Sequence, residues 1–490
     1  MEFWNLICRV ADRVPDRILL SDDHGRSLTT SAFRDAAERV AAGLALRPGA
    51  RVSWQLPTTL EAMVLMAALN RSGVDQNPII PMLREREVGL IVSQVEPALY
   101  IGPEAWAGFE FAEMGRRLGC EVLALDLSGE VGAALRLPTG DVATLNAPAD
   151  YDTEWIYYSS GTTSDPKGAR HTDASLVASV VALIEQAEFG EGDVYPIAWP
   201  VTHIGGVSML STALAGGMQL VLFDAWDPVT TPERMAAHAP TILGSAQPFF
   251  RAYVDAQDRR GDERLFPELR VCTAGGAPTP PEIVRDLIAT FGVRGVVGSY
   301  GLTEFPVATA ARSDDAPDVM LRTVGKPPRT VEVRLVQGEV RLKGPQCFAG
   351  YVDSALDEAA FDDEGWFRSG DLGEFDADGN LVITGRLKDV VIRNAENISA
   401  LEIEDVLLRH AGVADVAVIG LPDARTGERV CAVVVPEDGA RPDVAALAAH
   451  CLGAGLARYK CPEQVEIVDR LERNAMGKLL KQALRDSLLS

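Results

Sequence analysis

The segment from Tyr157 to Asp173, YYSSGTTSDPKGARHTD, combines residue types that bind phosphate. An aromatic pair leads into seven consecutive small, hydroxyl or acidic residues, and Pro166, Lys167 and Gly168 follow. Glycine and hydroxyl residues let backbone N–H groups turn toward phosphate oxygens, and a lysine adds positive charge. The residues alone leave two interpretations open, a phosphate-binding loop and an ordinary Ser/Gly surface loop.

The segment is not a Walker A loop, because G-x-x-x-x-G-K-[ST] is absent and no Ser or Thr follows Lys167. Three later segments also concentrate polar residues that could contact a nucleotide. They are GSYGLTE (298–304), WFRSGDLGEFDADGNLVITGRLKD (366–389) and NAMGK (474–478).

Taken together, the four segments resemble the motifs of the adenylate-forming enzymes, which comprise acyl-CoA synthetases, peptide-synthetase adenylation domains and luciferases. The family signature [ST]-S-G-[ST]-T-G-x-P-K-G is matched by SSGTTSDPKG, with Ser164 in place of the usual glycine. The other three segments are similar to the family's Y-G-x-T-E, G-D…G-R-x-K-D and C-terminal lysine motifs, in the family's order. The resemblance covers nearly the whole chain and favours the phosphate-loop interpretation.

The resemblance implies an ATP site. Residues 159–168 would hold the β- and γ-phosphates, Tyr300 would lie against the adenine ring, and Asp371 would accept hydrogen bonds from the ribose hydroxyls with help from Arg386. The positions that match the family's ATP-binding residues are Ser159, Ser160, Gly161, Thr162, Thr163, Lys167, Gly275, Gly276, Ala277, Tyr300, Gly301, Thr303, Asp371 and Arg386.

The resemblance also implies catalytic roles. Lys478 would contact the substrate carboxylate and the α-phosphate, where charge builds in the transition state. Thr303 would donate to the α-phosphate, and Glu304 would bind Mg²⁺, a hard cation that prefers oxygen ligands. His203 matches a histidine near the acyl site of relatives, and Lys388 matches their interdomain hinge.

The expected acyl pocket includes His203, Gly275 and Gly298. In the segments that line it in relatives (199–209, 244–250, 274–278 and 298–309), the only formally charged side chain is Glu304. Because an unpaired buried ammonium is costly, an amino-acid substrate is disfavoured. The acid is expected to have an apolar body, either a medium or longer fatty chain or an alicyclic or aromatic ring.

The function that follows is acyl-CoA ligation: ATP converts a carboxylic acid to acyl-AMP with release of pyrophosphate, and the thiol of coenzyme A then takes the acyl group. Two alternatives stay open. The acyl group could pass to a carrier-protein thiol, or the chain could be a catalytically silent acyl-nucleotide binding protein. Relatives usually carry a glycine pair near the pantetheine channel where this chain has Asn394-Ala395.

Composition excludes several other classes of protein. The net charge of -24 disfavours nucleic-acid binding and electrostatic docking to anionic lipid. Seven scattered cysteines without C-x-x-C spacing predict neither a disulfide framework nor a zinc site, and indicate reduced thiols in the cytoplasm. Residues 204–223 are long enough to span a membrane, but Gly216-Gly217 divides them into a helix and a strand. A homodimer is compatible with the sequence.

The elements that position these residues alternate along the chain. Short β-branched runs at 51–56, 218–223, 269–276 and 293–301 predict strands, and apolar residues at helical spacing predict helices at 60–73 and 280–292. The alternation predicts an α/β fold with sheets covered by helices, over a large domain at 1–386. The family resemblance implies the adenylate-forming enzyme fold.

A smaller α+β domain is expected at 387–490, carrying Lys478. A hairpin with an Asp-Gly turn at 378–379 precedes it, and Ser399 and Glu402 predict a capping box at the start of its first helix. Several cations fall in or after the connector, among them Arg393, Lys460 and Lys481. Their placement is consistent with phosphates bound at the domain interface.

Overall fold

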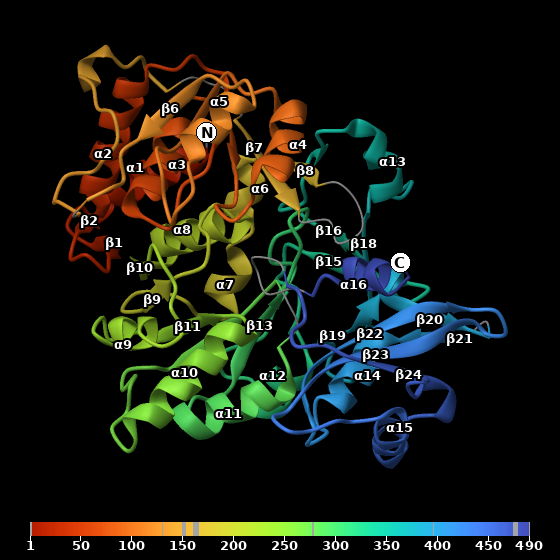
Figure 1. Ribbon diagram of the computed structural model, residues 1–490. Helices are drawn as coiled ribbons and strands as arrows, with labels where there is room; N and C mark the ends of the chain where they lie inside the picture. The colour runs from red at the N-terminus through yellow and green to blue at the C-terminus, as the bar shows by residue number, and fades with distance from the viewer. Residues whose placement is uncertain are drawn as a thin grey trace.

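The computed structural model describes residues 2–129, 131–148, 153–159, 166–276, 279–394, 396–473 and 479–489. Within these ranges the chain forms five sheets with helices packed against them (Figure 1). A large α/β part is followed by a small C-terminal part, as predicted.

The largest sheet positions the phosphate-loop segment. Its strand order is β17-β8-β7-β4-β3-β5-β6, parallel from β7 to β6, with β8 and β17 antiparallel at one edge. Ser159 and Lys167 are paired at the end of the β7–β8 hairpin. The strands are β3 (Arg51–Trp54), β4 (Asp75–Pro78), β5 (Leu99–Pro103), β6 (Val122–Leu125), β7 (Glu154–Ser159), β8 (Lys167–Thr172) and β17 (Gly350–Tyr351).

Two four-stranded sheets lie beside it, in the orders β2-β1-β10-β9 and β11-β12-β13-β14. The carboxyl ends of β12 and β13 carry the Gly275 and Tyr300 segments. The strands are β1 (Ile18–Asp22), β2 (Ser27–Thr29), β9 (Val194–Ile197), β10 (Gln219–Leu222), β11 (Ile242–Ser245), β12 (Val271–Ala274), β13 (Val296–Tyr300) and β14 (Thr309–Ala310).

Helices cover these sheets. Every residue of α3 is buried, and its apolar side chains share one core with those of α1, α2 and α8. The helices are α1 (Glu2–Arg13), α2 (Thr30–Leu44), α3 (Leu60–Arg71), α4 (Glu85–Val95), α5 (Phe111–Arg117), α6 (Asp173–Ala178), α7 (Val181–Glu185), α8 (Ile204–Gly216), α9 (Thr231–Ala236), α10 (Gln247–Arg260), α11 (Pro281–Phe291) and α12 (Pro317–Arg322).

An antiparallel sheet, β15-β16-β18-β19, closes the large part of the chain. Its β18–β19 hairpin turns at Gly379, whose φ of 82° lies in the left-handed region that an Asp-Gly turn requires. The elements are β15 (Glu332–Val336), β16 (Glu339–Lys343), α13 (Asp357–Ala360), β18 (Phe367–Phe375) and β19 (Leu381–Arg386).

The C-terminal part has its own sheet, β21-β20-β23-β22 with β24 beside β23. Its two apolar clusters contain only residues from Val391 onward, and Arg409 Nε contacts Glu282 Oε1 of α11 at 3.3 Å. The elements are β20 (Val390–Arg393), β21 (Glu396–Ser399), α14 (Ala400–Leu407), β22 (Val413–Asp423), β23 (Gly427–Pro436), α15 (Val444–Gly453), β24 (Gln464–Ile467) and α16 (Lys481–Leu489).

Two expectations about local structure meet different outcomes. The segment 204–223 divides as predicted: α8 ends at Gly216, the capping residue Gly217 has φ of 99°, and β10 follows. Within the described residues, no helix combines the length and apolarity needed to cross a bilayer. The capping box at α14 is half wrong: Ser399 accepts from Glu402 N–H, but the Glu402 carboxylate binds Lys460 Nζ at 2.7 Å instead of capping the helix.

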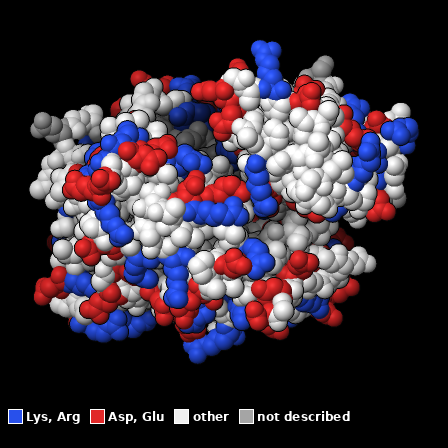
Figure 2. Space-filling model, turned by 90° about the horizontal axis from the view of Figure 1, so that it is seen from below, with Lys and Arg blue, Asp and Glu red and all other residues white. Residues whose placement is uncertain are grey.

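On the face of the molecule that Figure 2 shows, charged side chains do not segregate by sign. Figure 2 shows one face of the molecule, on which Lys and Arg are interspersed with Asp and Glu. The chain has 70 acidic residues against 46 basic ones, and no basic area on this face balances that excess.

Candidate active site

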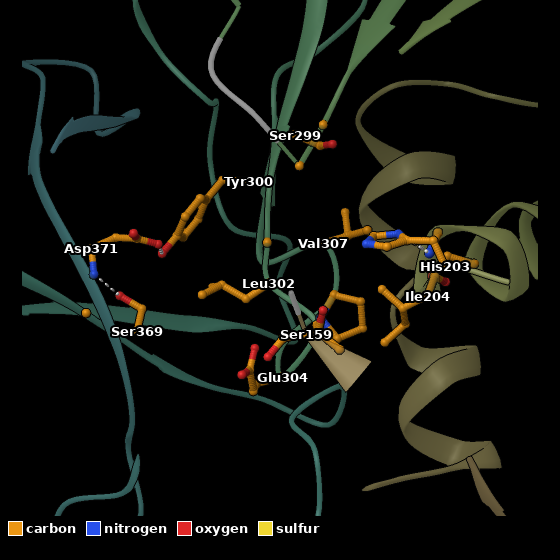
Figure 3. A pocket seen from close by; sticks show the side chains of 18 of the residues that line it. Ser159, His203, Ile204, Ser299, Tyr300, Leu302, Glu304, Val307, Ser369 and Asp371 are labelled. Carbon is orange, nitrogen blue, oxygen red and sulfur yellow. Dashed lines mark hydrogen bonds between the residues drawn. The ribbon is translucent and has the colours of Figure 1, made fainter. Parts of the chain in front are cut away.

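A cavity of about 640 Å³ brings most of the predicted site residues together. Side chains from β7, β8, α8, β12, β13, β18 and β19 line it. Figure 3 shows Tyr300 and Asp371 on one side, His203 and Ile204 on the other, and Glu304 between them. The cavity therefore has a charged side and an uncharged side.

Tyr351, which sequence reasoning missed, joins two of the charged residues. Its hydroxyl donates to Glu304 Oε1 at 2.8 Å, and Lys167 Nζ lies 5.5 Å from the centre of its ring. Burial and the neighbouring Glu304 raise the pKa of Tyr351, so the hydroxyl stays protonated and remains a donor. Glu304 Oε2 has no hydrogen-bond partner among the described residues.

Asp371 is held by two neighbours. Tyr300 Oη donates to its Oδ2 at 2.8 Å, and Arg386 Nε contacts its Oδ1 at 2.8 Å. The backbone N–H of Asp371 donates to Ser369 Oγ, which fixes the strand at this point. A carboxylate accepts about four hydrogen bonds, so Asp371 keeps acceptor capacity for a ligand.

His171 supports the Thr303–Glu304 segment from beneath, and sequence reasoning missed it as well. Its Nε2 lies 2.7 Å from the carbonyl oxygen of Thr303. Because a carbonyl only accepts, Nε2 carries the proton. Burial lowers the pKa of His171 to about 4, so the ring is neutral at pH 7 and its Nδ1 is an acceptor, 3.0 Å from Ser175 Oγ.

His203 caps α8 and lines the cavity. Its Nδ1 accepts from the N–H of Gly205 at 3.2 Å, and burial lowers its pKa to about 4. The neutral ring must then carry its proton on Nε2. His203 thus offers the cavity a neutral N–H donor.

The uncharged side of the cavity combines apolar walls with hydroxyl groups. Its described lining residues include Leu183, Tyr195, Trp199, Ile204, Ser208, Met209, Ser245, Thr273 and Val307.

Most predicted site residues that the structure describes lie on the cavity lining. They are Ser159, Lys167, His203, Gly275, Gly276, Tyr300, Gly301, Thr303, Glu304, Asp371, Arg386 and Lys388. The structure does not bring Gly298 there: a Cβ at this position would face Thr323 and Val324 instead. Ser160, Gly161, Thr162, Thr163, Ala277 and Lys478 lie outside the described residues.

Two positions in the connector gain a physical interpretation. Burial, and then the charge of Arg386, lower the pKa of Lys388, which lines the cavity. Asn394 has φ of 49° and donates its N–H to Thr426 O. Asparagine tolerates this left-handed conformation better than most residues, which explains how it replaces a glycine there.

Comparisons with known proteins find similar chains over nearly the whole length. The AMP-binding enzyme model matches residues 8–352, and the AMP-binding enzyme C-terminal domain model matches residues 402–478. A sulfoacetate–CoA ligase of Cupriavidus necator is 32% identical over 498 residues, covering 98% of this chain and 96% of the relative. A 2,3-dihydroxybenzoate–AMP ligase of Bacillus subtilis is 29% identical, covering 99% and 93%. The crystal structure of ATP-bound MatB from Rhodopseudomonas palustris matches with a TM-score of 0.85 at 28% identity, covering 99% and 98%.

Proposed function

Because this chain belongs to the family of AMP-binding, adenylate-forming enzymes, we propose that it is an acyl-CoA ligase for an apolar carboxylic acid. It would form acyl-AMP from the acid and ATP, release pyrophosphate, and transfer the acyl group to the thiol of coenzyme A. The observation that carries the proposal is the cavity itself. The residues expected to contact phosphate and ribose lie on one side of it, and uncharged residues line the other side.

The charged side suits ATP. Lys167 and Ser159, which are paired at the end of the β7–β8 hairpin and line the cavity, would contact the β- and γ-phosphates. Gly275 and Gly276 would lie beside the adenine ring; a Cβ on Gly275 would come within 2.8 Å of Ser299 Oγ, and Gly276 has φ of 79°, so both positions favour glycine. Asp371, held by Tyr300 and Arg386, would accept hydrogen bonds from the ribose hydroxyls with its remaining lone pairs.

The described residues also fit Mg²⁺. Glu304 offers one carboxylate oxygen without a partner, and no group of three or more His, Cys, Asp or Glu among the described residues could hold an ion without a ligand's help. Mg²⁺ in nucleotide sites commonly takes one or two carboxylates together with substrate phosphates. When bound, it would neutralise phosphate charge during pyrophosphate release.

The chemistry follows from the poor electrophilicity of a carboxylate, which must be activated before a thiol can attack its carbonyl carbon. A carboxylate oxygen attacks the α-phosphorus of ATP, the bond to the β-phosphate oxygen breaks, and pyrophosphate leaves. Thr303 and Lys478 would stabilise the charge at the α-phosphate, the latter by family resemblance. In the second step the thiol sulfur attacks the acyl carbonyl and AMP leaves. The Nε2–H of His203 would donate to the substrate's carboxyl oxygens.

The two steps need different groups at the same cavity: Lys478 for adenylation, and the thiol for acyl transfer. We place the domain boundary between Arg386 and Leu387 and the hinge at Lys388; the separate core of the C-terminal part supports this division. Rotation of the C-terminal part would replace Lys478 at the cavity with the thiol of coenzyme A.

Pyrophosphate release and product formation test the proposal. Purified protein is mixed with ATP, Mg²⁺ and a panel of apolar acids, with coenzyme A, with a purified carrier protein bearing its phosphopantetheine thiol, and with neither. We expect acid-dependent pyrophosphate release and acyl-CoA by mass spectrometry. Acylation of the carrier alone would reassign the acceptor, and the absence of pyrophosphate with every acid would leave the binding-protein alternative. A Lys167→Ala variant serves as the control for release at this site.

A further inference from the structure

The uncharged side of the cavity contains a hydroxyl group whose proton has no acceptor. Tyr195, on β9, is 2% exposed, and its Oη accepts a long hydrogen bond of 3.4 Å from Trp199 Nε1. The indole can only donate, so this contact leaves the hydroxyl proton of Tyr195 unused. Burial raises the pKa of Tyr195 to about 12, which keeps that proton in place.

The neighbouring backbone does not supply the acceptor. Tyr195 Oη lies so close to Gly244 that a Cβ there would be 2.2 Å away, yet the carbonyl of Gly244 accepts from Tyr253 Oη at 2.8 Å. Thr273, also on the lining, uses its own hydroxyl to donate to Val297 O. No described residue accepts from Tyr195, and Ser245, on the same lining, likewise has no hydrogen-bond partner for its side chain among the described residues.

The charges of the lining decide what kind of group could pair with these donors. Every charged side chain among the described lining residues is Glu304 or belongs to the phosphate-loop, β16, β18, β19 and connector segments. A second anionic group on the acid would therefore be buried without a cation, and an ammonium on this side would be buried without a carboxylate to pair with it. A neutral oxygen satisfies both conditions.

We propose that the acid bears a neutral hydrogen-bond acceptor, such as a keto, ether or hydroxyl oxygen, on the part of its apolar body that reaches Tyr195. The inference rests on the proposed function and narrows its substrate class. A purely hydrocarbon body against Tyr195 would leave its hydroxyl proton unpaired, whereas an oxygen at this point would accept that proton in a hydrogen bond.

Matched pairs of acids test the inference on the full-length enzyme. Each pair has similar shape and differs in one oxygen: octanoic and 7-oxooctanoic acid, cyclohexanecarboxylic and 4-oxocyclohexanecarboxylic acid, 4-isopropylbenzoic and 4-acetylbenzoic acid. Sulfoacetate adds a second anion. The kcat/KM for pyrophosphate release is measured for wild type, Tyr195→Phe, Ser245→Ala and Tyr157→Phe. The last is the matched control, since Tyr157 is also 2% exposed, does not line the cavity, and has a hydroxyl without a hydrogen-bond partner among the described residues.

We expect wild type to prefer the oxygen-bearing member of at least one pair by about tenfold, which corresponds to ~1.4 kcal/mol. Tyr195→Phe should reduce that preference to less than threefold, and Tyr157→Phe should keep it. If Tyr195→Phe does not fold, Ser245→Ala should still weaken the preference. Equal use of both members of every pair, a preference that survives both Tyr195→Phe and Ser245→Ala, or a preference for sulfoacetate would overturn the inference while leaving the ligase activity established. Failure of every acid to release pyrophosphate would instead overturn the proposed function, and the inference with it.

Discussion

Replacing the buried histidine beneath the nucleotide segment should change how the protein responds to acid. In the folded state the pKa of His171 is lowered to about 4 by burial, whereas an unfolded histidine has a pKa near 6.5. Between these values the unfolded chain binds a proton that the folded chain refuses, so stability falls as the pH drops below about 6.5 and levels off below about 4. Between pH 7 and pH 5 the loss from this residue is about 2 kcal/mol.

His171→Gln isolates the effect. The glutamine amide does not titrate in this range, and its N–H can still donate to the carbonyl of Thr303, which His171 contacts at 2.7 Å. Urea unfolding of the large part, followed by tryptophan fluorescence at pH 7, 6 and 5, compares the variant with wild type. Wild type should lose about 2 kcal/mol more than the variant between pH 7 and 5. Equal losses would show that His171 is not held neutral, and the assignment of its tautomer would be wrong.

Three further variants probe the site. Lys478→Ala should cut adenylation by about 10²–10³ while largely sparing thioester formation from preformed acyl-AMP; equal loss in both half-reactions would contradict the two-state assignment. Lys388→Pro should preserve adenylation and slow thioester formation, because proline fixes φ, and Lys388→Ala, which removes the side chain alone, is its control. Tyr351→Phe deletes the 2.8 Å hydrogen bond to Glu304 but keeps the ring beside Lys167. It should weaken Mn²⁺ binding to the ATP-bound protein, measured by electron paramagnetic resonance as the concentration needed for half-occupancy. This effect should be several-fold larger than the increase in the KM for the acid. An unchanged metal affinity would show that Tyr351 does not position Glu304.

Much of the fold was predictable because it depends on local patterns. The strand–helix alternation, the division of residues 204–223 at Gly217 and the β18–β19 turn at Gly379 each follow from residue types that dictate local backbone conformation. The capping box failed where tertiary contact competed with local chemistry. Glu402 lies near Lys460, 58 residues away in sequence, and a charge-assisted pair with it replaces the contact to the helix end.

The site was less predictable where its residues act through distant partners. The residues adjacent to Tyr351 and His171 in sequence do not predict that Tyr351 contacts Glu304 or that His171 contacts Thr303. Each pair is brought together only by the tertiary fold. Cations of the connector region and the C-terminal part were predicted to serve phosphates, but distant carboxylates occupy them. Arg393, Lys460 and Lys481 pair with Glu463, Glu402 and Glu404, so a count of charges along the chain overstates the positive charge that they offer to phosphates.

The cavity wall includes Leu387 and Lys388, the first residues beyond the proposed domain boundary. A nucleotide that contacts them binds with a different affinity in each orientation of the C-terminal part. By thermodynamic reciprocity, nucleotide binding must change the equilibrium constant between the orientations by the same factor. A remote contact that favours one orientation therefore acts as an effector. Arg409 and Glu282 form such a contact across the two parts, at 3.3 Å and outside the cavity lining. An exposed ion pair is worth about 0.5 kcal/mol, so its loss would change nucleotide affinity about twofold without touching the ligand.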